Sequence, residues 1–332
     1  MAVAAAGLLW SYFLTWHLWQ PRTDPPNLPI ASALRSIQFG VPLVVAAALS
    51  IVWPRIGAML HTVLFGLAVL GDQIRLQPEF VSLAILLAAG SWAPRGLYVA
   101  RWHLIALWGW AGVHKLLSAG WATSGAFYIA NAAGRPGWRA LVAVAVPLCE
   151  VGLAVLAVLA VWPRTWAVLR IVAPLFHVGI VATLMMADHN TAVWPWNLAL
   201  AAATPLLFRP QAPADRPVAR RSAVALATTT AFAIYPLGFY VGLSDAYLSH
   251  NLYANNTAQA SICARGWVEA GGLCFPAFLS TLETLNVPLP PERRLFVGWF
   301  RRTCQPGDQL RIDGIFTRLS PRRTTYVACV GR

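Results

Sequence analysis

A single lysine lies in the otherwise apolar stretch Leu107–Trp121, LWGWAGVHKLLSAGW. A charged side chain at membrane depth costs at least about 2.5–3.5 kcal/mol, so such a residue is by default a functional candidate. Burial readily lowers the pKa of a lysine, which turns an inert ammonium into a base. We therefore take Lys115 as the first candidate catalytic residue. The alternative is a structural lysine whose stem lies along the membrane interface and whose charge stays in water.

Two more ionisable residues lie in apolar stretches. Glu150 is in VPLCEVGLAVLAVLAV, and His177 follows Phe176 in a later stretch. A lone carboxylate within a membrane is either neutral or paired, and Lys115 or His177 is the candidate partner. We take both as catalytic candidates, with His177 as an acid or base. The alternatives are a structural hydrogen bond between helices for Glu150 and a packing role for His177.

A dense polar cluster, DQIRLQPE, covers residues 72–79 between two apolar stretches. It holds two carboxylates, two amides and an arginine, and we interpret it as the polar mouth of a site. Glu79 is taken as a catalytic candidate. A solvated turn with an Asp–Arg pair is the alternative. The residues predicted to bind substrate are Asp72, Gln73, Arg75, Gln77, His114, Trp121 and Asn197.

The composition indicates a multi-pass membrane protein. Of 332 residues, 58% are hydrophobic and only 11% are charged, whereas soluble domains carry about 25% charged residues. The net charge of +13 does not indicate nucleic-acid binding, because the arginines lie in short gaps between apolar runs. The sequence has no Walker lysine, no GxGxxG, no HExxH and no GxSxG, and we predict no metal.

Nine apolar stretches are long enough to be candidate transmembrane helices. We therefore expect an all-α polytopic bundle of eight or nine spans over residues 1–243. One side of this bundle receives more arginines, including the run at 209–221, and is predicted to be cytoplasmic together with the N-terminus. The stretches are 2–19, 36–53, 56–71, 79–93, 97–118, 139–161, 166–186, 191–208 and 221–243.

Residues 244–332 are expected to form a small α+β domain outside the cytoplasm. Alternating patterns predict strands at 309–316 and 324–330, and PPERRLFVGWFRR at 290–302 predicts a short amphipathic helix. Four of the five cysteines lie here, which favours two disulfides and an oxidising compartment. The pairing cannot be read from the sequence, although Cys263–Cys274 with Cys304–Cys329 is the most local choice. A zinc site is the alternative, without any CxxC spacing to support it.

The order DQIRLQPE, AGVHKLLSAGW, then LFHVGI and NTAVWPWNLALAAATPLLF resembles the HTTM superfamily, over roughly residues 35–208. This membrane domain is shared with vitamin K-dependent gamma-carboxylase, and the chain looks like a bacterial member. The resemblance implies that Lys115 is the base and that a reduced, vitamin K-like quinone is the cofactor. His114 replaces the first lysine of the carboxylase pair. Glu79 stands where the carboxylase has a histidine, so the carboxylation half-reaction is not expected.

Two classes of function remain open. The first is a membrane enzyme, a quinone-dependent oxygenase of carboxylase-like type, acting on a lipophilic small molecule among membrane lipids. The second is a non-catalytic maturation, export or immunity partner of a secreted peptide, which would contact the outer domain and the DQIRLQPE loop. In both, the predicted location is the bacterial cytoplasmic membrane. A passive channel is disfavoured, because the apolar stretches are too uniformly apolar.

Overall fold

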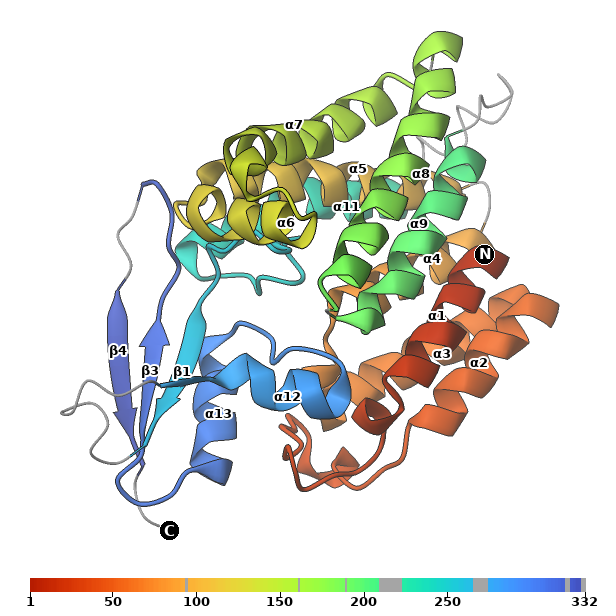
Figure 1. Cartoon of the computed structure of the whole chain (residues 1–332). Helices are drawn as coiled ribbons and strands as arrows, with labels where there is room; N and C mark the ends of the chain where they lie inside the picture. The colour runs from red at the N-terminus through yellow and green to blue at the C-terminus, as the bar shows by residue number, and fades with distance from the viewer. Residues whose placement is uncertain are drawn as a thin grey trace.

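The structure is a computed structural model that describes residues 1–92, 95–160, 162–188, 190–208, 223–264, 274–319 and 323–329. Within these residues the chain is mostly helical, with 12 α-helices and one small antiparallel sheet. Figure 1 shows the long helices gathered on one side and the sheet on the other. The basic run at 209–221 and His189 lie outside the described residues.

Each of the nine apolar stretches forms a helix in the structure. Proline stands in the first turn of several of them, where its missing N–H leaves no bond unmade. The nine helices are α1 (Ala2–Leu14), α2 (Gly40–Val52), α3 (Pro54–Gly71), α4 (Pro78–Ser91), α5 (Arg95–Leu117), α7 (Arg139–Val158), α8 (Pro163–Met186), α9 (Trp194–Leu207) and α11 (Ala223–Ile234).

Four segments among the described residues are long and apolar enough to cross a membrane. They are Pro54–Gly71, Pro136–Val158, Pro163–Met186 and Ala223–Val241. The expected count of eight or nine spans is not supported by the helix lengths. Helices α1 and α2 have 13 residues each, and a helix of that length reaches only about 20 Å of the roughly 30 Å hydrocarbon core.

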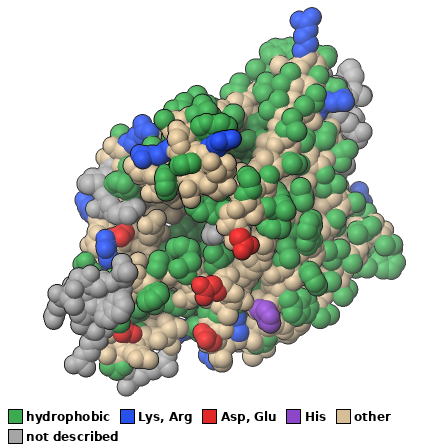
Figure 2. All heavy atoms as spheres, viewed as in Figure 1, with side chains coloured by type: hydrophobic (Ala, Val, Ile, Leu, Met, Phe, Trp, Pro, Cys, Tyr) green, Lys and Arg blue, Asp and Glu red, His purple; other side chains and the backbone are tan. Residues whose placement is uncertain are grey.

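The helices carry apolar side chains on their outer faces. Leu141, Val144 and Leu148 of α7 are each more than half exposed, as is Leu175 of α8. Figure 2 shows hydrophobic side chains over most of the helical part, with Lys and Arg side chains mainly at its edges. An exposed apolar face of this extent is typical of a surface that meets lipid or another protein.

The C-terminal region contains the predicted strands and helix. Strands β1 (Gln259–Cys263), β2 (Phe275–Pro276), β3 (Gln309–Asp313) and β4 (Thr324–Ala328) form one antiparallel sheet in the order β2-β1-β3-β4. Helices α12 (Ala277–Leu285) and α13 (Arg293–Thr303) lie between this sheet and the long helices (Figure 1). The strand predictions at 309–316 and 324–330 and the helix prediction at 290–302 are confirmed, with shorter bounds.

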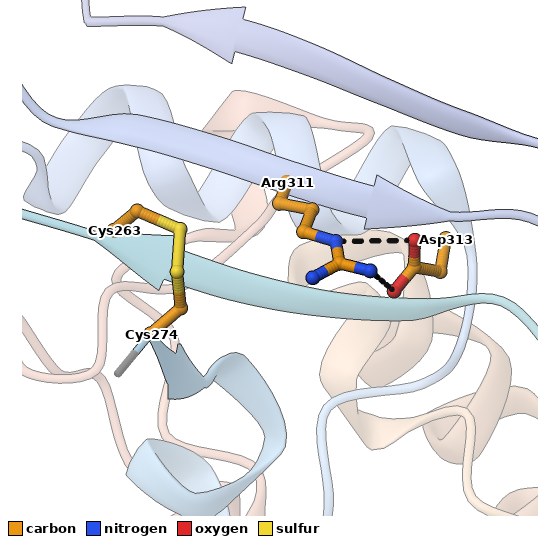
Figure 3. The surroundings of a disulfide bond; sticks show 4 residues. All are labelled: Cys263, Cys274, Arg311 and Asp313. Carbon is orange, nitrogen blue, oxygen red and sulfur yellow. Dashed lines mark hydrogen bonds and ion pairs between the residues drawn. A yellow bond between two sulfur atoms is a disulfide. The ribbon is translucent and has the colours of Figure 1, made fainter. Parts of the chain in front are cut away.

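Two disulfides hold this region together, in the most local of the pairings. Cys263–Cys274 joins the end of β1 to the start of β2, next to the Arg311–Asp313 ion pair on β3 (Figure 3). Cys304–Cys329 joins the end of α13 to the end of β4. Cys149, on α7, is free and exposed.

Helix α6 (Ala126–Ala132), which follows a π-helical turn at Trp121–Gly125, was not expected from the sequence. The segment 244–258, between α11 and β1, is also irregular. His250, Tyr253 and Asn255 have positive φ angles, which lets the chain turn sharply there. This segment runs back against the long helices and thereby reaches the candidate site.

Candidate functional site

Lys115 and Glu150 meet as a buried ion pair between α5 and α7. The Lys115 Nζ atom lies 2.8 Å from Glu150 Oε1, and both side chains are almost fully buried. The two helices pack closely because Gly112 has no side chain. A Cβ atom there would lie 2.7 Å from the Pro147 carbonyl oxygen. Of the two partners that the sequence suggested for Glu150, Lys115 and His177, the structure pairs it with Lys115.

Other acceptors also surround the ammonium of Lys115. Its Nζ donates to the Leu252 carbonyl oxygen at 3.1 Å, and the Trp121 ring centroid lies 5.5 Å away. Trp121 itself donates its indole N–H to the Ala143 carbonyl, which fixes the ring. On the other side of the pair, Glu150 Oε2 is buried without a hydrogen-bond partner among the described residues. The pair thus has one saturated end, at Lys115, and one open end, at Glu150.

His177 is held between two hydrogen-bond partners on neighbouring helices. Trp108 Nε1 donates to His177 Nε2 at 3.0 Å, and His177 Nδ1 lies 2.9 Å from Asn197 Oδ1. An indole N–H only donates, so Nε2 must carry the lone pair and Nδ1 the proton. Asn197 Nδ2 donates to the Val193 carbonyl, which keeps Oδ1 turned toward His177. His177 is therefore a neutral imidazole with both nitrogens occupied.

The predicted residues Lys115, Glu150, His177 and Asn197 line one cavity. Its volume is about 50 Å³, and Trp108, Trp196 and other large side chains of α5, α8 and α9 also line it. The structure therefore brings together four residues that are up to 82 positions apart in the sequence, from Lys115 to Asn197.

His114 points away from this cavity. Its Nδ1 is hydrogen-bonded to the Tyr240 hydroxyl at 2.7 Å, and its Nε2 is hydrogen-bonded to the Ser249 carbonyl oxygen at 2.8 Å. Adjacent residues of a helix point about 100° apart, which separates His114 from the target of Lys115. His114 thus anchors the 235–250 region to α5, and the structure does not place it at the predicted substrate site.

The DQIRLQPE cluster divides into two parts. Asp72 is fully buried and accepts hydrogen bonds from Arg22, from the Leu28 N–H and from the Ile74 N–H. Arg75 is fully buried too, and its guanidinium donates to the Leu18, Ala68 and Gln20 carbonyls. These saturated groups tie the chain after α1 to the end of α3. Asp72 and Arg75 do not line the cavity at Lys115, whereas we expected them to bind substrate.

Gln73 does not line the cavity at Lys115 either. Its Oε1 accepts from Arg294 at 3.1 Å, and Arg294 binds Asp245 through two nitrogens. These contacts link the cluster to α13 and to the 244–258 segment. Beside them, Glu292 accepts the Ala246 N–H at 2.7 Å, and burial raises the pKa of the Glu292 carboxyl to about 7.

Gln77 and Glu79 line a second, larger cavity of about 220 Å³. Gln77 donates to the Ile74 and Pro288 carbonyls, which joins α4 to the C-terminal region. This cavity and the one at Lys115 share Trp196, Leu252 and Tyr253 as lining residues. The two cavities are therefore neighbours, separated by the 244–258 segment.

No site residue was expected from the sequence in the 244–258 segment. Leu252 nevertheless supplies a backbone acceptor to Lys115, and Asn251 and Tyr253 line the larger cavity. The polar density of HNLYANN, at 250–256, is the signal that could have found them. The segment reaches the site because the chain turns back after α11, and a hydropathy pattern does not reveal such a turn.

Comparisons with protein-family models, with curated proteins and with solved structures found no match for this chain.

Proposed function

We propose that this protein is a membrane enzyme of HTTM type that transfers a proton to or from a lipophilic substrate at the Lys115–Glu150 pair. The observation that carries the proposal is the shared cavity of Lys115, Glu150 and His177, which come from three helices. The motif AGVHKLLSAGW and the Phe-His motif, which suggested the superfamily, both contribute residues to it.

The ion pair supplies a route by which Lys115 acts as a base. Its Nζ first passes a proton along the 2.8 Å hydrogen bond to Glu150 Oε1, which leaves a neutral amine and a neutral acid. In a low-dielectric interior this neutral pair competes with the ion pair, because burial disfavours both charges. The amine then takes a proton from a hydroxyl group of the substrate and becomes an ammonium again.

In this scheme His177 holds neighbouring side chains in place and does not carry protons. Both of its nitrogens are occupied by Trp108 and Asn197, so no free site remains on the imidazole. Its contribution is to fix Trp108 and Asn197 as walls of the cavity. This narrows the role expected from the sequence, in which His177 was an acid or base.

The cavity limits what can reach Lys115. At about 50 Å³ it does not enclose the bicyclic ring of a naphthoquinone. The reduced quinone is implied only by the resemblance. The proposed reaction is proton transfer from a weakly acidic hydroxyl group.

The finer architecture is part of the same proposal. We place the chain in the bacterial cytoplasmic membrane, with the N-terminus in the cytoplasm and the disulfide-bonded region outside. The four long apolar segments would be joined there by the shorter apolar helices, in a bundle of eight or nine spans, of which nine places the two ends of the chain on opposite sides. The apolar outer faces and the two disulfides support this placement.

The test uses purified protein in nanodiscs, a chemically reduced naphthoquinone and oxygen. Conversion of the hydroquinone and oxygen to quinone epoxide and water is followed by mass spectrometry. Lys115→Arg keeps the charge but does not readily deprotonate, so turnover should fall at least 100-fold. Glu283→Gln, an exposed change on α12, is the matched control. Wild-type turnover in Lys115→Arg excludes the base role.

A second candidate function is favoured by the saturation of Lys115. Three groups surround its ammonium, which is the arrangement of a purely structural ion pair between helices. The protein would then be a non-catalytic partner of a secreted peptide. Lys115 is the only lysine in the chain, so a ¹⁵N-lysine sample gives a single Nζ signal. A signal that stays unchanged with every added hydroquinone, together with no turnover, favours this second function.

A further inference from the structure

The larger cavity has no role in the proposed proton transfer. It lies where the start of α4 and the segments 190–196 and 247–260 face α12 and residues 288–296. Its volume of about 220 Å³ is below the roughly 300–1,000 Å³ of drug-sized ligand sites, so only a ligand smaller than these fits within it.

Four side chains that line this cavity carry buried polar atoms without hydrogen-bond partners among the described residues. They are Glu79 (Oε2), Asn251 (Oδ1 and Nδ2), Asn190 (Oδ1) and Trp196 (Nε1). All four residues are at least nine-tenths buried. An unsatisfied buried polar group costs about 1–3 kcal/mol, and folded proteins keep few of them. Several around one cavity therefore indicate that something polar binds there.

The kinds of unpaired atom define the chemistry of the ligand. Three are acceptors, on Glu79, Asn251 and Asn190, whereas two groups are donors, on Asn251 and Trp196. No lysine or arginine is among the described lining residues, and Glu79 is their one acidic side chain. An anion would meet this carboxyl group without a counter-charge, which makes anionic ligands unfavourable.

We propose that this cavity binds a small primary amine with an apolar body. A primary ammonium donates three hydrogen bonds and accepts none, which matches the three unpaired acceptors but leaves the two unpaired donors, Asn251 Nδ2 and Trp196 Nε1, without a partner on the ligand. The amine restores a counter-charge to the buried Glu79 carboxylate. Phe278, Leu282 and Phe296 provide apolar wall for the hydrocarbon part. The site is independent of turnover at Lys115, so its test requires no activity.

The probes are three near-isosteric molecules: phenethylamine, 2-phenylethanol and 3-phenylpropionate. Their affinity for the full-length protein in zwitterionic nanodiscs is measured by calorimetry, with empty nanodiscs subtracted. We expect phenethylamine to bind at least tenfold more tightly than the alcohol, and the carboxylate to bind most weakly. Equal affinity for the three probes, or binding of none, overturns the proposal.

Two variants locate the binding. Glu79→Gln keeps the shape and removes the charge, so the preference for the amine over the alcohol should disappear. Glu283→Gln makes the same chemical change at an exposed position of α12 and should leave the preference intact. Should Glu79→Gln fail to fold, Leu282→Trp fills the cavity from the partly buried face of α12 and should abolish amine binding. Amine preference that survives in Glu79→Gln, or amine binding that survives in Leu282→Trp, contradicts the assignment.

Discussion

Lys115 of α5 and Glu150 of α7 form a buried ion pair, with 2.8 Å between Nζ and Oε1. The attraction between two buried charges offsets the cost of removing each of them from water, so the contribution of one residue to stability depends on the other. Its energetic and chemical consequences are therefore best tested by changing one partner and then both.

Removal of one partner should destabilise the protein by about 3–5 kcal/mol, because it leaves an uncompensated buried charge. We expect this loss for Lys115→Met and for Glu150→Gln, in unfolding measurements in detergent. The double variant Lys115→Met/Glu150→Leu replaces both charges with apolar groups and should regain most of the lost stability. A double variant as unstable as the sum of the two single variants would refute the coupling.

The hydrogen bonds of His177 predict one neutral tautomer, with the proton on Nδ1. The nitrogen chemical shifts of a ¹⁵N-histidine sample should show this form unchanged from pH 5 to pH 8. Asn197→Leu removes the acceptor and should cost about 1–3 kcal/mol, since Nδ1–H is then buried without a partner. A His177 signal that titrates within this range would instead return the residue to an acid–base role.

Glu292 predicts a pH dependence of stability. Burial raises the pKa of its carboxyl from about 4.5 to about 7, so the folded state binds more protons than the unfolded chain between these values. The free energy of unfolding should therefore fall as the pH rises from about 4.5 through 7. Glu292→Gln should remove this contribution, whereas the exposed Glu283→Gln should preserve it. The check is denaturant unfolding at several pH values, and an identical pH profile in wild type and Glu292→Gln speaks against the prediction.

The Cys304–Cys329 disulfide joins α13 to β4 across 25 positions of the sequence. Its loss should destabilise the C-terminal region by about 3 kcal/mol, mainly because the unfolded chain regains freedom. We expect the C-terminal region of Cys304→Ser/Cys329→Ser to unfold at a lower denaturant concentration than in wild type. Reduction of this bond should then no longer contribute to the effect of reductant on stability. Cys149→Ser, which changes the free cysteine, serves as the control. Peptide mapping without reductant that finds another pairing contradicts the prediction.

The positions of the two chain ends distinguish nine spans from an even number of spans. Four or eight spans place both ends of the chain on the same side of the membrane, whereas nine place them on opposite sides. We expect the N-terminus inside and the disulfide-bonded end outside, where an oxidising compartment suits Cys263–Cys274. Compartment-specific reporters fused to each end will test this. Reporters that place both ends on the same side would exclude nine spans and leave four or eight.

Sequence periodicity and composition were sufficient for the local elements. The nine apolar stretches became helices, and the strands at 309–313 and 324–328 and the helix at 293–303 lie inside or at most one residue beyond the predicted ranges. These features depend on side chains within a few turns of each other, which is the information that hydropathy and alternation carry. The predicted count of eight or nine spans is not supported, because an apolar stretch does not reveal where its helix ends.

Only the tertiary structure decided which polar residues work together. The sequence singled out Lys115, Glu150 and His177 because charges and imidazoles are conspicuous in apolar stretches. It did not separate Asp72 and Arg75, which saturate backbone groups, from Glu79, which lines a cavity. It also passed over Asn251 and Leu252, whose placement depends on a reversal of the chain after α11. Burial and hydrogen-bond partners arise from residues far apart in the sequence, and local patterns hold no record of them.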